Sequence, residues 1–194
     1  LPDDDRNILI ARYHAADGGE PKGNLLDMYD GELDFLGDQP VDPDMAGLVA
    51  DNDGKLRGAV AVKVGDTLDD IQLRLYAKID DEWEQIELDS KRVRPSVSFL
   101  GFSSDNEQVY FSSNHDMASG DVLGVFRFDF ATRQTELLYR HEHVNARALL
   151  RTPSGKVLGA WASFGPADYS LFDDQVEALP LDADGHRGAA LLTA

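Results

Sequence analysis

Three segments of this 194-residue chain share one pattern, an apolar strand followed by a polar turn and a second strand. They are residues 48–60 (LVADNDGKLRGAV), 100–112 (LGFSSDNEQVYFS) and 149–161 (LLRTPSGKVLGAW). Aligning the turns makes Gly54, Asn106 and Gly155 equivalent, at spacings of 52 and 49 residues. One four-stranded β-propeller blade occupies about 40–50 residues. The repeat therefore predicts consecutive propeller blades.

Apolar and polar residues alternate within each repeat, which is the period of a β-strand and not of a helix. Residues 71–79 are the clearest case, with five apolar side chains on one face and Gln72, Arg74, Tyr76 and Lys78 on the other. We expect the first face to be buried and the second to be exposed. Further strands are predicted at 8–13, 25–29, 33–36, 83–88, 97–102, 108–113, 122–130, 134–140, 148–151, 156–162, 169–172, 176–181 and 189–193.

The predicted fold class is therefore all-β, with consecutive four-stranded antiparallel blades in a single domain, 1–194. About three blades plus flanking strands make a partial propeller. The predicted blades are 1–45 (incomplete), 46–92, 93–143 and 144–194. Three blades cannot close the ring that normally removes sheet edges, and open edges recruit other strands. We therefore expect an excised part of a longer propeller, and a homo-oligomer through open sheet edges is one way to stabilise it.

The charge of the chain limits its partners. Lys and Arg number 18 against 36 Asp and Glu, which gives a net charge of −18. Binding to nucleic acid or to an anionic membrane requires a basic surface, so neither is expected. No apolar run approaches the roughly 20 residues of a membrane span, so we expect a soluble protein. Cysteine is absent, which leaves both the cytoplasm and the periplasm open as locations.

The sequence contains no complete catalytic motif. A hydrolase nucleophile elbow requires G-x-S-x-G, and the nearest string, residues 101–105 (GFSSD), lacks the second glycine. Histidines group only as His115 beside Asp116 and as His141 with His143, without an identifiable third metal ligand. We expect these three histidines to occupy exposed loop positions. No catalytic, cofactor-binding or metal-binding residue is predicted.

Other polar and aromatic groups also favour structural roles. Residues 51–54 (DNDG) and 182–185 (DADG) resemble parts of calcium loops, but neither has the full ligand spacing, so we expect tight turns with positive φ. Trp83 and Trp161 are predicted to pack in the core or between blades rather than to bind sugars. The acidic residues are so numerous that no carboxylate pair for glycoside cleavage is identifiable.

Two strings of the sequence resemble a known family. Residues 48–57 (LVADNDGKLR), and residues 152–161 (TPSGKVLGAW) followed by 167–173 (ADYSLFD), resemble the N-terminal propeller of the prolyl oligopeptidase family, in particular its dipeptidyl aminopeptidase and acylaminoacyl-peptidase-like members. The resemblance covers roughly residues 45–175. In that family a propeller of seven or eight blades caps an α/β-hydrolase domain that carries the Ser, Asp and His of the triad. No triad motif matches a position here.

The resemblance implies a non-catalytic, substrate-gating part of a serine peptidase, with a C-terminal α/β-hydrolase domain as partner and a peptide as substrate. The alternative is a stand-alone, propeller-like scaffold for protein interactions. A propeller glycosidase that uses its own acidic residues is the third hypothesis. Under all three hypotheses we expect no cofactor and no peptidase activity from this chain alone, whereas the full-length protein could be an enzyme.

Overall fold

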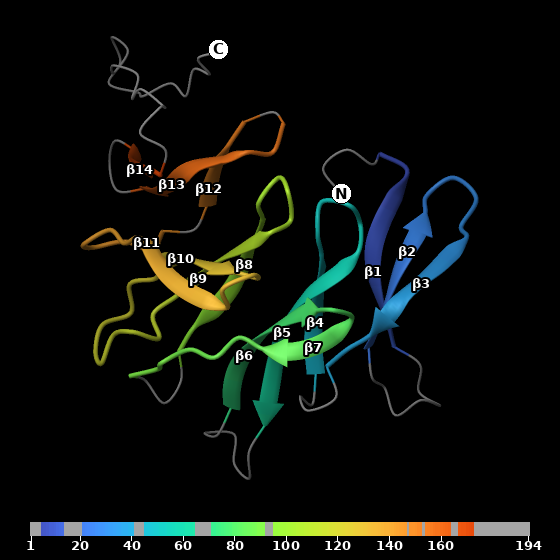
Figure 1. Ribbon diagram of the computed structural model, residues 1–194, viewed down its shortest axis with the longest axis horizontal. Coiled ribbons are helices and arrows are strands. Elements are labelled where there is room, and N and C mark those ends of the chain that lie inside the picture. The colour runs from blue at the N-terminus through green and yellow to red at the C-terminus, as the bar shows by residue number, and fades with distance from the viewer. Residues whose placement is uncertain are drawn as a thin grey trace.

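The computed structural model describes residues 5–13, 21–40, 45–64, 71–91, 95–146, 148–152, 154–163 and 167–172, which form four antiparallel sheets (Figure 1). The first sheet contains β1 (Asn7–Tyr13), β2 (Pro21–Asp27) and β3 (Leu33–Asp38). The second contains β4 (Met45–Ala50), β5 (Leu56–Val64), β6 (Ile71–Ile79) and β7 (Glu82–Gln85). The third contains β8 (Val97–Phe102), β9 (Gln108–Ser113), β10 (Gly124–Asp129) and β11 (Gln134–Tyr139). The fourth contains β12 (Ala148–Arg151), β13 (Val157–Ser163) and β14 (Ala167–Leu171).

In every sheet the strands are neighbours in chain order, which is the up-and-down arrangement expected of propeller blades. The sheets follow one another around the molecule (Figure 1). The first strand of the third sheet, β8, contacts β5 and β6 of the second, and β4 contacts β1 and β2 in the same way. The predicted all-β class is confirmed, with the second and third sheets complete at four strands.

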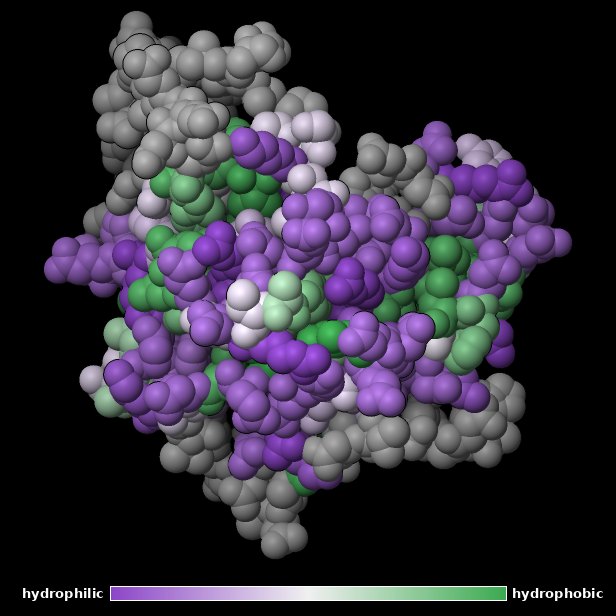
Figure 2. All heavy atoms as spheres, in the orientation of Figure 1, coloured by the Kyte–Doolittle hydropathy of each residue, from purple (hydrophilic) through white to green (hydrophobic). Residues whose placement is uncertain are grey.

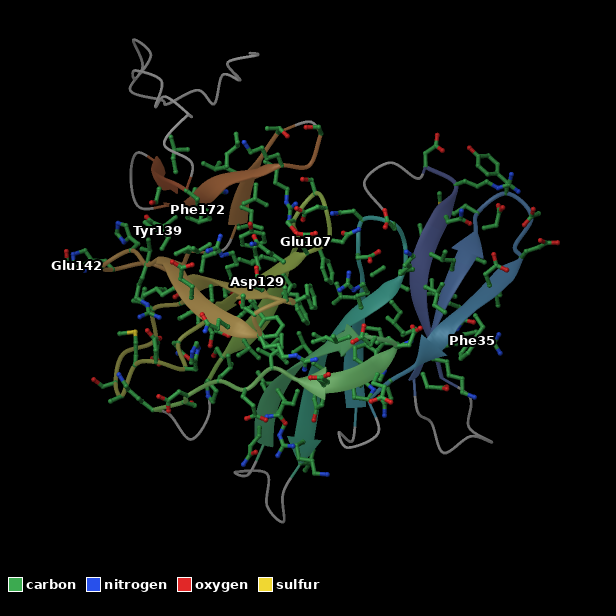
Figure 3. All side chains as sticks on the ribbon, viewed as in Figure 1. Phe35, Glu107, Asp129, Tyr139, Glu142 and Phe172 are labelled. Atoms are coloured by element: carbon green, nitrogen blue, oxygen red, sulfur yellow. The ribbon has the colours of Figure 1, made fainter. Side chains whose placement is uncertain are left out.

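Apolar clusters fill the spaces between successive sheets, because each sheet can bury a face only against its neighbour. The largest cluster joins the second and third sheets and includes Leu75, Val109, Phe111 and Phe126. A smaller cluster around Ala59, Ala61, Tyr76 and Trp83 lies on the second sheet, and the Trp83 indole donates to the Asp38 carbonyl of β3 at 2.9 Å. Between the third and fourth sheets, Tyr139 and Phe172 lie close together (Figure 3).

The backbone repeats in detail at the turn that follows the first strand of each of the last three sheets. The predicted equivalent residues all have positive φ: 80° at Gly54, 60° at Asn106 and 83° at Gly155. A register shift also precedes each turn, at 49/50, 99–101 and 150/151. Glycine and asparagine tolerate this conformation better than other residues. The alignment made from sequence is therefore confirmed, as is the positive-φ turn predicted for residues 51–54.

Two expectations are wrong. Tyr76 was expected on an exposed face, but only 5% of it is accessible, because the second sheet is covered on both faces at its centre. The strand predicted at 83–88 ends at Gln85, although the Ile86 amide still donates to the Leu75 carbonyl at 2.8 Å. The predicted strands 176–181 and 189–193 and the turn 182–185 lie outside the described residues. Within the described part, no helix has the length and hydropathy needed to cross a membrane.

Candidate ligand pocket

The three equivalent turns are each closed by a side-chain oxygen from their first residue. The Asp51 carboxylate accepts from the amide of Lys55 at 2.9 Å. In the second turn the Ser103 hydroxyl accepts from the backbone amide of Gln108 at 2.9 Å. In the third turn the Thr152 hydroxyl accepts from the backbone amide of Lys156 at 3.0 Å. Asp, Ser and Thr are suited to this task because their short side chains reach the backbone locally. Each of the three turns is therefore held in a fixed conformation by its own side chain, although the turns belong to three different sheets.

The first two of these turns are also joined to each other. The Asn52 amide donates to the Asn106 side-chain oxygen at 3.0 Å, and the Asn52 side chain donates to the Ser103 carbonyl at 2.6 Å. Arg57 adds a third link, from its guanidinium to the Asn106 carbonyl at 2.9 Å. Hydrogen bonds between successive sheets hold the turns in fixed relative positions, which is a requirement for a preformed binding site.

A pocket of about 570 Å³ is lined by residues of all three turns. Leu9 of β1 and the ends of β4 and β8 supply its apolar wall, which includes Leu48, Leu100 and Phe102. The polar side chains of its wall are Asp51, Asn52, Ser104, Arg151, Thr152 and Ser154. A volume of this size is within the range of small-molecule and peptide sites.

Arg151, the last residue of β12, is the distinctive group in this wall. Its Nη1 donates to the Phe102 carbonyl at 2.8 Å and to the Gly155 carbonyl at 3.1 Å. Among the described residues no carboxylate forms an ion pair with it. Burial lowers the pKa of Arg151 from its ordinary value, but a guanidinium remains charged at neutral pH. The pocket therefore contains a half-buried cation without an acidic partner in the described structure.

Gly101 makes room for this guanidinium. A Cβ atom at position 101 would lie 2.5 Å from Arg151 Nη2, and the φ of Gly101 is 127°. Any other residue would strain the backbone at this φ and would displace the end of the Arg151 side chain. The string 101–105 thus forms a strand end and turn rather than a nucleophile elbow, as predicted. Its Ser103 hydroxyl closes the turn and donates to the Asp105 carboxylate.

The buried acid in the pocket wall is already compensated. The side chain of Asp51 is 1% exposed and lies 3.8 Å from the guanidinium of Arg57. It also accepts from the amide of Asp53 at 3.0 Å. Arg57 in turn stacks over the Phe130 ring at 4.3 Å, which holds it in place. Because Asp51 and Arg57 offset each other, the uncompensated charge of the pocket wall is that of Arg151.

Arg151 was not among the predicted site residues, although the repeat contains a signal for it. In the aligned segments the residue before the turn is Ala50, Phe102 or Arg151. The first two are apolar, as the end of an inner strand requires, and the third introduces a charge at the same place. A charged residue that replaces an apolar one at an equivalent, at least partly buried position is a candidate for function.

His115 is buried, and the expectation of an exposed position is wrong for this residue. It lies in the loop after β9, 5% exposed, with its ring 4.5 Å from that of Phe126 and its Nδ1 3.1 Å from the Ser113 hydroxyl. The adjacent Asp116 accepts two hydrogen bonds from Arg140, at 2.6 and 2.8 Å. This pair ties the loop to the end of β11.

The pKa of His115 is shifted below 6.5 chiefly because the ring is buried, and Arg140 lowers it further while Asp116 and Asp89 partly oppose the shift. As the pH falls below 6.5, this histidine takes up a proton in the unfolded chain before it does so in the folded protein. The free energy of unfolding therefore decreases between pH 6.5 and the lower pKa of the folded state. We expect His115→Gln to remove this part of the pH dependence, measured as the urea midpoint at about pH 5.5 and 7.5. His143→Gln, at an exposed ring, should keep the wild-type dependence. An unaltered pH slope in His115→Gln would contradict the assignment.

The other predicted residues do not gather into a reactive site. His141 accepts backbone hydrogen bonds from His143 and Val144, at 3.0 and 3.2 Å, and so caps the turn after β11. Trp83 packs between sheets as predicted. Trp161 is 37% exposed and lines a second pocket of about 550 Å³ together with residues 121–122 and 143–145, so its packing role stays a prediction. Among the residues that the structure describes, no three metal-ligating side chains cluster.

Comparison with solved structures finds TolB from Acinetobacter baumannii, with a TM-score of 0.49 and 13% sequence identity over 88% of this chain. The chain spans 38% of the length of that structure. No family model matches the sequence. No curated protein matches it either.

Proposed function

We propose that this chain is a non-catalytic binding and gating module, and that its ligand binds in the pocket between the three turns. The observation that carries this proposal is the uncompensated guanidinium of Arg151 inside a pocket whose walls are held by hydrogen bonds between sheets. A half-buried charge without an acidic partner among the described residues is costly to a fold, so its presence in a pocket favours a role in binding. This proposal requires no catalytic group from the chain.

The specific form that we propose is the substrate-gating propeller of a serine peptidase of the prolyl oligopeptidase family. Support comes from the two strings that resemble that family, 48–57 and 152–161, which also supply residues of the pocket wall. Rigid sheets around a narrow opening admit a flexible peptide and exclude a folded protein. The partners in this proposal are an α/β-hydrolase domain of the same protein and the peptide that passes the gate.

The coding sequence that contains this chain tests the peptidase proposal. We expect it to encode a further domain of about 200 residues with G-x-S-x-G, followed by Asp and His in hydrolase order. The purified 194-residue chain should show no turnover of aminoacyl or prolyl chromogenic peptides, because it would lack the triad. A coding sequence without a hydrolase domain would rule out the peptidase proposal, and turnover by the pure chain would contradict the non-catalytic assignment.

A stand-alone interaction scaffold is the second candidate, and the surface of the first sheet favours it. Met28, Tyr29 and Phe35 are all more than half exposed on β3 and the turn before it, and Figures 2 and 3 show this region at the edge of the molecule. Large apolar side chains that are exposed favour a contact with another protein. This candidate requires a coding sequence without a hydrolase domain, together with a second copy of the chain bound in solution.

A further inference from the structure

We propose that the pocket binds the carboxylate group of a peptide and that Arg151 is the anchor. This inference deepens the proposed binding function and rests on it. Arg151 uses Nη1 for its two backbone hydrogen bonds, whereas Nη2 and Nε donate to none of the described residues. A guanidinium offers two parallel donors to a carboxylate, and one edge of this guanidinium retains that capacity.

The surroundings hold the guanidinium in one orientation. The carbonyls of Phe102 and Gly155 fix Nη1 from two different sheets, and Nη2 lies against Gly101, in the place that a side chain there would occupy. A fixed donor pair loses little rotamer entropy when a ligand binds. The wall is therefore organised for an anion before the anion arrives.

A carboxylate suits this site better than a phosphate. Among the described residues Arg151 is the positive charge of the pocket wall without an acidic partner, whereas Arg57 is already paired with Asp51. The chain as a whole carries a net charge of −18, which repels a dianion more strongly than a monoanion. At physiological salt the repulsion from acidic residues more than roughly 8 Å away is largely screened. A single negative charge in direct contact with Arg151 is therefore still attracted.

The other lining groups suit a peptide. Leu9, Leu48 and Leu100 provide an apolar wall for a side chain. The Ser104 hydroxyl lines the pocket and makes no hydrogen bond with the described residues, and the Thr152 and Ser154 hydroxyls lie 2.8 Å apart at its rim. These hydroxyls are able to pair with the amide groups of a bound chain. The volume of about 570 Å³ accommodates a short peptide.

The test measures binding of tripeptides to the full 194-residue chain by calorimetry. Ala-Ala-Phe and Ala-Pro-Ala are each used as the free acid and as the C-terminal amide, and an acetylated tripeptide amide with a central Glu tests a side-chain carboxylate. We expect the free acids to bind at least about tenfold more tightly than the amides, the range for a hydrogen bond to a charged group. Binding of the Glu peptide would show that the pocket accepts a side-chain carboxylate as well as a C-terminal carboxylate.

Variants separate a binding role for Arg151 from a structural one. Arg151→Gln should reduce free-acid binding to the level of the amides, and Arg151→Lys should give an intermediate affinity because it retains charge without the paired donors. Arg127→Gln removes a surface charge on β10 that pairs with Glu136 and should leave binding unchanged. Thermal unfolding of each variant without peptide measures the stability lost with the two backbone hydrogen bonds of Arg151, independently of peptide binding.

Each failure has a distinct meaning. Equal binding of acids and amides by the wild-type chain would overturn the carboxylate inference and leave the proposed binding function standing. Wild-type affinity in folded Arg151→Gln would overturn the role of Arg151. Absence of binding by every peptide at millimolar concentration would remove both the inference and the proposed ligand pocket.

Discussion

Replacing Phe111 with alanine is expected to lower the free energy of unfolding by about 3–5 kcal/mol. Phe111 on β9 is fully buried, and it is the largest of the fully buried side chains in the described part of the chain. Its ring stacks on that of Phe126 with centroids 5.5 Å apart. The cluster around it joins the second and third sheets, so its loss weakens contact between sheets and leaves a cavity.

Urea denaturation of Phe111→Ala against wild type measures this loss. Phe35→Ala is the matched control, because the same ring on β3 is 61% exposed and its truncation should change stability by no more than about 0.5 kcal/mol. A stability for Phe111→Ala close to that of Phe35→Ala would mean that the second and third sheets do not share a core.

The second large effect is expected at Gly159 on β13. A Cβ atom there would lie 2.1 Å from the Ser170 carbonyl oxygen and 3.0 Å from the Leu171 Cα, both of them backbone atoms of β14. Backbone in a paired strand cannot move aside without loss of its hydrogen bonds. We therefore expect Gly159→Val to separate β14 from β13, at a cost of about 3 kcal/mol or more.

Hydrogen exchange identifies the site of this effect, since the β14 amides should lose their protection before those of β8–β11. Gly47→Val is the control, because position 47 on β4 has only ordinary contact with the Val60 carbonyl, at 3.8 Å. Valine is well suited to a strand with that much space, so this variant should be as stable as wild type. If Gly159→Val retained full protection of β14, the close approach of the two strands would be disproved.

Local features were predictable from sequence because they depend on residues near one another in the chain. The turns at Gly54, Asn106 and Gly155 could be aligned because a tight turn with positive φ restricts its own residue types. Strand alternation located β8, β9 and β11 within one residue at either end. The absence of an elbow at 101–105 followed equally from local glycine spacing.

Burial was less predictable, since it depends on which surfaces meet. Tyr76 alternates like an exposed residue, yet it is buried in a cluster with Ala59, Ala61, Leu48 and Trp83, which lie on other strands of its own sheet. His115 follows a strand like a typical loop residue, yet its ring lies against Phe126 and Phe111. In both cases the covering side chains include residues on other strands of the same sheet, which the alternation of a single strand does not reveal.

The amino-acid sequence by itself determined the repeat, the strands and the residue types that close each turn, because these follow from short-range sterics and from the two-residue period of a strand. Only the tertiary structure brought Arg151 to the Phe102 carbonyl and beside Gly101, residues about 50 positions earlier in the chain. The reason is physical: contacts between sheets form only once each sheet has buried its apolar face on the next. A pocket assembled from three separate turns therefore has no signature in any one of them.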